Sequence, residues 1–236
     1  MRKYLKVLVF FMLACAFFLG VLAWRKEYAK SEIRESMKKT VLESIDAGTY
    51  EVPAGDYLSV SGEDMEPDLD LLASWIKIAQ YHEGTGSEEY ATLHLAGVIE
   101  IPSLAIEEPV WKENTDVAMR YGVIVMEDFA GIEEDGNCVI LGHRSLVTST
   151  TFWNLTDISE DDEVLITTPD GVRHEYRVSG TYYCSPYDLQ SYLDGPDNCA
   201  KQITLVTCAK ERGTSWRFIA VLLPCESKAS SIQYTD

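Results

Sequence analysis

The chain has 236 residues, of which 46% are hydrophobic and 11% aromatic. A chain of this length buries one core of ordinary size, so we expect a single globular domain with appendages. The formal net charge of -18 at pH 7 argues against nucleic acid as a partner, because such binding uses clustered Lys and Arg side chains to neutralise phosphates.

The N-terminus predicts a membrane anchor. Residues 7–24 carry no charge and follow three basic side chains, Arg2, Lys3 and Lys6. As a helix, such a run extends about 27 Å, close to the hydrocarbon thickness of a bilayer. No clear small-x-small cleavage site follows it, so we predict a retained single-pass signal anchor in the cell membrane, with residues 1–6 as a cytoplasmic tail and the domain outside the cell. The basic residues after the run outnumber those before it, so charge counting alone does not set this orientation.

Residues 25–91 are predicted to form a helical stalk or N-terminal extension. Apolar residues at helical spacing indicate one helix over residues 27–46 and a second over residues 68–82, and Gly and Pro interrupt the chain between them. We expect this region to be separable, so that a chain lacking residues 1–89 stays folded and active.

From about Thr92 onward, short runs of β-branched and aromatic residues alternate with turn residues. This texture predicts a mostly β domain over residues 92–225, followed by a C-terminal tail over residues 226–236. Seven or eight short strands without a long helix between them fit a barrel or a sandwich. A hairpin turn is marked by Pro169-Asp170-Gly171, because Pro presets the first turn angle and Gly accepts a positive φ. The candidate strands are residues 93–101, 119–126, 138–141, 164–168, 173–183, 202–207 and 218–223.

Cysteine counting indicates an unpaired thiol. Without Cys15, which lies in the apolar run, an odd number of cysteines remains, and in an exported protein the leftover thiol is accidental, intermolecular or reactive. Cys184 and Cys199 bracket a Pro-containing segment and either bridge it or stay two plain thiols. The pairing of Cys138 and Cys225 stays open in the same way.

Cys208 ends an apolar strand, and Arg217 begins the next one nine residues later. Two adjacent strands would place the thiol beside the guanidinium, whose fixed positive charge stabilises a thiolate and a developing oxyanion, as acyl transfer at a carbonyl requires. A nucleophilic Cys also needs a His that moves protons.

His143 is the best candidate for this His, because it leaves an apolar strand at the rim, where side chains exit the core. For the other three histidines we expect surface or structural roles: His82, His94 and His174.

These residues resemble the sortase family of cysteine transpeptidases. Thr204-Leu205-Val206-Thr207-Cys208 matches the family signature T-L-x-T-C, and Arg217 falls where the family places its arginine, with Gly142-His143 upstream in the matching order. The resemblance covers roughly residues 93–223. Further similar segments are residues 97–102, 108–111, 136–143 and 152–155.

The resemblance implies a sortase-type eight-stranded β-barrel with Cys208, His143 and Arg217 as its catalytic residues. Cys208 would attack a carbonyl within an LPxTG-like sorting signal and form a thioester, His143 would protonate the leaving amine, and Arg217 would position substrate and stabilise the oxyanion. An amine of peptidoglycan or of a pilin would resolve the thioester. The implied partners are surface proteins with a C-terminal sorting signal, the amine acceptor and the membrane; no cofactor and no nucleic acid is implied.

Two details stay open within this resemblance. Some sortases bind calcium through acidic loops, but we expect residues 160–163 to form a solvated turn and predict no metal site. The Gly142-His143-Arg144-Ser145 sequence and the spacing from Cys208 to Arg217 resemble a class B or class D layout, closer to the pilus- and sporulation-associated branches than to the housekeeping branch. No second apolar span follows Leu223, which argues against the class with a C-terminal membrane anchor.

Three alternative functions remain: a thiol peptidase that only hydrolyses, a degenerate sortase that binds peptides without turnover, and a non-catalytic surface β-domain held by disulfides. The peptidase would release its product with or without an added amine. The surface domain would hold Cys208 in a disulfide.

Overall fold

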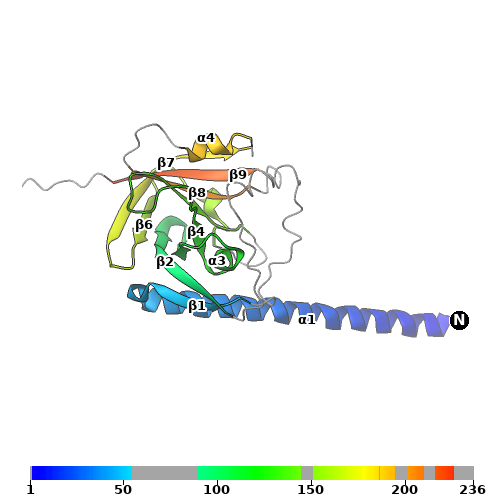
Figure 1. Ribbon diagram of the computed structural model, residues 1–236. Coiled ribbons are helices and arrows are strands. Elements are labelled where there is room, and N and C mark those ends of the chain that lie inside the picture. The colour runs from blue at the N-terminus through cyan, green and yellow to red at the C-terminus, as the bar shows by residue number, and fades with distance from the viewer. Residues whose placement is uncertain are drawn as a thin grey trace, which may run out of the picture.

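Eight strands of the computed structural model close into a barrel (Figure 1). The structure describes residues 2–54, 90–144, 151–185, 187–194, 201–209 and 216–225. The strands follow the order β2-β3-β4-β5-β8-β9-β7-β6, and β6 pairs again with β2, which closes the sheet on itself. The predicted mostly β, eight-stranded barrel is therefore confirmed. Its strands are β2 (Tyr90–Ile101), β3 (Ile106–Trp111), β4 (Val123–Val125), β5 (Gly136–Leu141), β6 (Glu163–Thr167), β7 (Arg173–Cys184), β8 (Lys201–Cys208) and β9 (Arg217–Pro224).

A further strand, β1 (Thr49–Pro53), extends the sheet beside β2. It pairs antiparallel with the start of β2, from Thr49 opposite His94 to Pro53 opposite Tyr90. The Tyr121 hydroxyl donates a hydrogen bond to the Pro53 carbonyl at 2.9 Å. Part of the region that the sequence indicated as a helical extension thus contributes a strand to the sheet.

Helices surround the barrel, and the longest of them, α1 (Arg2–Glu43), runs past one side and continues beyond the strands (Figure 1). It contains most of the helix predicted over residues 27–46. The helix predicted over residues 68–82 lies outside the described residues. The shorter helices are η1 (Ile45–Ala47), η4 (Pro102–Leu104), α3 (Asp116–Tyr121), η5 (Leu155–Asp157) and α4 (Leu189–Leu193).

The predicted membrane anchor is wrong. Among the residues that the structure describes, no helix combines the length and the apolar character that crossing a membrane requires, so single-pass localisation in the cell membrane is not supported. Residues 7–24 form the first part of α1, which continues without a break to Glu43 and packs against the barrel through Met37 and Val41.

The strands are covered on two faces. Because neighbouring residues of a strand point to opposite sides, Leu205 and Ala220 lie among buried residues from all eight barrel strands, whereas Val206 and Ile219 belong to a second, outer cluster. This outer cluster includes buried residues of α1, β1, α3 and α4: Val41, Tyr50, Val52, Ala118, Tyr121, Leu189 and Leu193. β8 is buried on both faces, since every residue from Gln202 to Thr207 is buried.

The strand predicted over residues 119–126 is wrong in its first part. The Thr115 hydroxyl accepts a hydrogen bond from the Ala118 amide at 3.2 Å and caps α3, so the chain is helical there. β4 begins only after Gly122, where an added Cβ would lie 2.3 Å from the Pro109 carbonyl oxygen. The close approach of the chain to β3 at this point is possible only for glycine.

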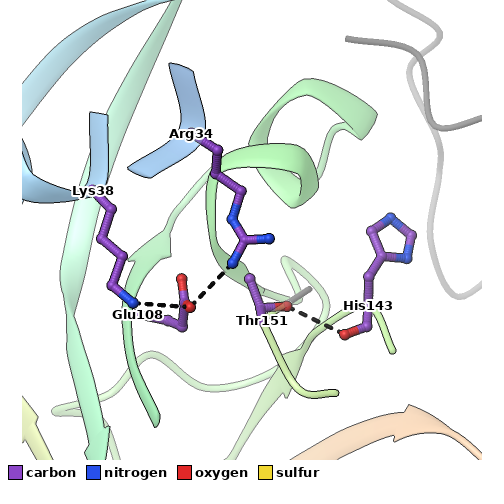
Figure 2. A network of polar contacts seen from close by, with 5 residues as sticks. All are labelled: Arg34, Lys38, Glu108, His143 and Thr151. Atoms are coloured by element: carbon purple, nitrogen blue, oxygen red, sulfur yellow. Dashed lines mark hydrogen bonds and ion pairs between the residues drawn. The ribbon is translucent and has the colours of Figure 1, made fainter. Parts of the chain in front are cut away.

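Buried ion pairs fix α1 against β3. Glu108 of β3 is 5% exposed, and its Oε1 lies 3.3 Å from Arg34 Nη2 and 3.2 Å from Lys38 Nζ, both on α1 (Figure 2). Burial raises the pKa of the Glu108 carboxyl, an effect that the two cations oppose. Removing a partner from such a network leaves a buried charge without compensation. The network therefore specifies where α1 docks.

We expect a chain that begins at Tyr90 to be markedly less stable than the full chain, contrary to the separability predicted from the sequence. It lacks Val41, Tyr50 and Val52, and the ring of Tyr50 packs edge-on against Trp111 with centroids 5.8 Å apart. Each square ångström of apolar surface that returns to water costs about 25 cal/mol. Thermal unfolding should show a lower Tm and increased binding of a hydrophobic dye.

A chain that begins at Ala29 is the matched control, because it retains every α1 residue of the outer cluster, from Ile33 to Leu42. Its Tm should equal that of the full chain. Equal Tm values for both truncated chains would show that the N-terminal segment does not contribute to the folded domain.

Candidate active site

Two parallel strands bring His143 and Cys208 to the same end of the barrel. β5 and β8 pair in register, with Leu141 opposite Val206. One residue beyond β5, the Gly142 amide donates to the Val206 carbonyl at 3.1 Å. Continuing this register places His143 level with Cys208, on strands that lie about 4.8 Å apart. Both side chains are partly exposed.

Arg217 lies on the other side of Cys208. β8 and β9 are antiparallel, and their register pairs Cys208 with Arg217. The next pair is hydrogen-bonded, since the Ala209 amide donates to the Trp216 carbonyl at 3.0 Å. Hydrogen-bonded and non-hydrogen-bonded pairs alternate, so Cys208 and Arg217 form a non-hydrogen-bonded pair, the kind whose side chains lie closer together. The thiol and the guanidinium therefore leave the same face of the sheet as neighbours.

Cys184 extends this arrangement to a row across four adjacent strands. It lies opposite Arg217 in the pairing of β7 with β9, so the row runs His143, Cys208, Arg217, Cys184. Cys184 is 2% exposed, and burial raises the pKa of its thiol to about 11, although the Arg217 guanidinium acts in the opposite direction. A buried thiol held in its protonated form is a poor nucleophile. Of the two cysteines in the row, Cys208 is the accessible one.

Cys138 does not compete for this role, because it is buried. Burial raises the pKa of the Cys138 thiol to about 12. Within the described ranges no cysteine forms a disulfide, and Cys208 is a free thiol. The free thiol argues against the alternative of a surface domain held by a Cys208 disulfide. Cys199, and with it the bridge considered to Cys184, lies outside the described residues.

The backbone of His143 is held by the segment that leads into η5. The Phe152 amide donates to the His143 carbonyl at 3.0 Å and the Thr151 hydroxyl donates to it at 3.4 Å. Just before it, a Cβ on Gly142 would lie 2.4 Å from Cδ2 of Phe152, so the packing of this ring requires glycine. Figure 2 shows the imidazole of His143 turned away from Thr151 and from the Glu108 ion pairs.

Two side chains beside the candidate catalytic residues tie the strand ends together. The buried Thr207 hydroxyl, on β8, donates to the Gly142 carbonyl at 2.8 Å. In the opposite direction, Arg144 Nη1 donates to the Cys208 carbonyl at 3.5 Å. Neither contact was predicted from the sequence, where the only signal was that each residue stands next to a candidate catalytic residue.

The remaining histidines lie elsewhere. His94 Nδ1 contacts the Glu113 carboxylate, and His174 Nε2 lies 3.4 Å from Glu133 Oε1. His82 lies outside the described residues.

The acidic run over residues 160–163 forms a turn at Glu160 and Asp161 and leads into β6 at Glu163. Asp161 adopts a positive φ of 68°. Asp162 accepts hydrogen bonds from the Ser103 hydroxyl at 2.9 Å and from the Ser159 amide at 3.0 Å. These contacts use the Asp162 carboxylate to cap the turn. In the part of the chain that the structure describes, no three His, Cys, Asp or Glu side chains are grouped as metal ligands would be.

Thr207→Val should destabilise the protein, because it leaves the buried Gly142 carbonyl without its side-chain donor. An unsatisfied buried acceptor costs about 1–3 kcal/mol, which chemical denaturation measures directly. Thr207→Ser is the matched control, since it keeps the hydroxyl and should retain most of the stability. A Val variant as stable as the Ser variant would show that the hydrogen bond does not hold the strand ends together.

Comparisons with known proteins concern the family and the fold of the chain. Residues 99–223, more than half of the chain, match the family model described as the sortase domain. Sortase A of Bacillus anthracis is 25% identical over 123 residues, which cover 52% of this chain and 56% of that protein. Sortase A of Listeria monocytogenes serovar 1/2a is 26% identical over 136 residues, which cover 58% and 59%. The chain thus matches less than two thirds of the length of these relatives.

The fold is similar to a solved structure, sortase A from Corynebacterium diphtheriae. The TM-score is 0.53 with 21% sequence identity, and the match covers 88% of this chain and 92% of that one. At this identity the likeness concerns the fold alone, and it identifies the eight-stranded barrel as the sortase type.

Proposed function

The chain belongs to the sortase family of cysteine transpeptidases, and from this membership we propose that it cleaves an LPxTG-like sorting signal and transfers the cleaved protein to an amine. Cys208 is the proposed nucleophile, His143 the proton carrier and Arg217 the oxyanion stabiliser. The observation that carries the proposal is the register of β5, β8 and β9, which supports a thiol flanked by an imidazole on one side and a guanidinium on the other.

The first half of the reaction uses all three side chains. The Cys208 thiolate attacks the carbonyl carbon of the Thr–Gly bond, and the carbonyl oxygen becomes an oxyanion. The Arg217 guanidinium, fixed at the start of β9, offers this oxyanion a positive charge that needs no reorganisation. Collapse of the intermediate breaks the C–N bond as the His143 imidazolium gives its proton to the leaving amine. The product is a thioester on Cys208.

The second half reverses these roles. An incoming amine attacks the thioester carbonyl and loses a proton to the neutral His143 imidazole, and Cys208 leaves as a thiolate. The net result exchanges one amide bond for another. Water in place of the amine gives a carboxylic acid, which is the reaction of the thiol peptidase. The proposed partners are surface proteins with a C-terminal sorting signal and an amine of peptidoglycan or of a pilin.

Mass spectrometry tests the proposal directly. The purified chain is incubated with a library of LPxTG-like peptides and triglycine, beside Cys208→Ala. We expect a peptide–triglycine adduct that is absent from the variant, because the thioester cannot form without the thiol. Cleavage with no adduct would favour the thiol peptidase. Absence of product with every peptide would favour the degenerate, peptide-binding alternative.

Arg217→Gln should lower kcat for adduct formation by about 10²–10³, the typical effect of removing one oxyanion donor. Arg217→Lys should be intermediate, because an ammonium keeps the charge but lacks the planar fork of a guanidinium. Arg173→Gln is the control, since Arg173 is exposed at the opposite end of β7 from Cys184. Equal kcat for Arg217→Gln and Arg173→Gln would remove Arg217 from the proposed machinery.

A further inference from the structure

The guanidinium of Arg144 joins three segments of the chain. Its Nε donates to the Trp153 carbonyl at 3.1 Å, its Nη2 to the Thr156 hydroxyl at 3.0 Å and its Nη1 to the Cys208 carbonyl at 3.5 Å. Arg144 directly follows His143. One side chain therefore connects the exit of β5, the segment around η5 and the end of β8.

The backbone of Cys208 explains why a side chain is needed at this point. In its non-hydrogen-bonded pair with Arg217, the Cys208 carbonyl does not face β9. It faces β5, as the Val206 carbonyl does two residues earlier, which accepts the Gly142 amide. β5 ends at Leu141. At the Cys208 carbonyl, a guanidinium nitrogen donates where a longer strand would have supplied a peptide N–H.

We propose that Arg144 is a positioning residue that fixes Cys208 relative to His143. This inference rests on the proposed function, in which those two side chains exchange a proton through the reaction. Arg144 acts with Thr207, because each donates to a backbone carbonyl of the opposite strand end: Arg144 to Cys208 and Thr207 to Gly142. These two crossed ties hold the strand ends on either side of the reacting pair. Displacement of a reacting group by about 1 Å can cost about 10²-fold in rate.

The shape of the side chain matters as much as its charge. The planar guanidinium presents its N–H groups in a fixed fork and reaches all three acceptors at once, which an ammonium on a flexible stem does not reproduce. The three acceptors are two carbonyls and a hydroxyl, all neutral. These three contacts fix the position of the guanidinium plane.

Three variants separate position from charge. Arg144→Lys keeps the charge without the fork, Arg144→Gln removes both, and Thr156→Val removes one anchor while leaving Arg144 itself unchanged. For peptide transfer to triglycine we expect both Arg144 variants to lower kcat about 10–10²-fold with KM within about twofold. Thr156→Val should show a smaller loss of kcat in the same direction. Wild-type kcat in Arg144→Lys would overturn the proposal, because charge alone would then suffice.

Two further measurements do not depend on turnover. Amide hydrogen exchange over residues 201–209 should be faster in the Arg144 variants and in Thr156→Val, at unchanged exchange over β6, because the β8 end loses a tie. The pH profile of Cys208 alkylation by iodoacetamide should keep its midpoint in Arg144→Lys and Thr156→Val. If wild-type protein transfers no peptide, the proposed function fails, while these measurements still test Arg144. Exchange over residues 201–209 that is unchanged in all three variants would overturn the positioning role.

Discussion

The register of β5 on β8 is the constraint on which the candidate site depends. The buried Thr204 hydroxyl donates to Asn137 Oδ1 at 2.8 Å, and Asn137 Nδ2 donates to the Leu193 carbonyl at 2.6 Å. Buried polar groups are costly unless they are hydrogen-bonded. A shifted register would leave these two buried side chains without their hydrogen-bond partners. A slip of one residue would also move Cys208 to the opposite face of the sheet, away from Arg217. The Asn137–Thr204 pair, which lies on the outer face of the sheet beneath α4, thus specifies which side chains meet at the end of the barrel.

The covering of the outer face connects the N-terminal segment to the same strands. Val206 and Ile219, one residue pair inward from the thiol and the guanidinium on the same face, share the outer cluster with Val41 of α1 and Val52 of β1. The Glu108 ion pairs hold α1 over this face. The packing of α1 and β1 therefore stabilises β8, which ends at Cys208, and β9, which begins at Arg217. The geometry of the candidate site and the packing of the N-terminal segment are parts of one folded unit.

Local patterns in the sequence predicted what depends on local order. The apolar runs predicted the barrel. The strand-end placement of Cys208, His143 and Arg217 predicted neighbours that the register brings together, and their catalytic roles stay a prediction.

β1 was missed because it is short, ends at Pro53 and pairs with residues far along the chain. The helix α3 was missed although its cap, Thr115, was readable. The membrane anchor was wrong because, among the described residues, no helix has the length and the apolar character that spanning a membrane requires. The contacts of Arg144 join segments distant in sequence and leave no periodicity to read.

The row His143, Cys208, Arg217, Cys184 places one cysteine on each side of Arg217, and burial distinguishes the two cysteines. Arg217 lies between Cys208 and Cys184, and a thiolate on either would draw on the same guanidinium. Burial raises the pKa of Cys184 to about 11, so near neutral pH its thiol stays protonated and does not neutralise Arg217. The positive charge is then available to the partly exposed side of the row, where Cys208 and His143 lie. Cys184 is buried with Leu189 and Leu193 of α4, so packing around this helix leaves the Arg217 charge facing Cys208.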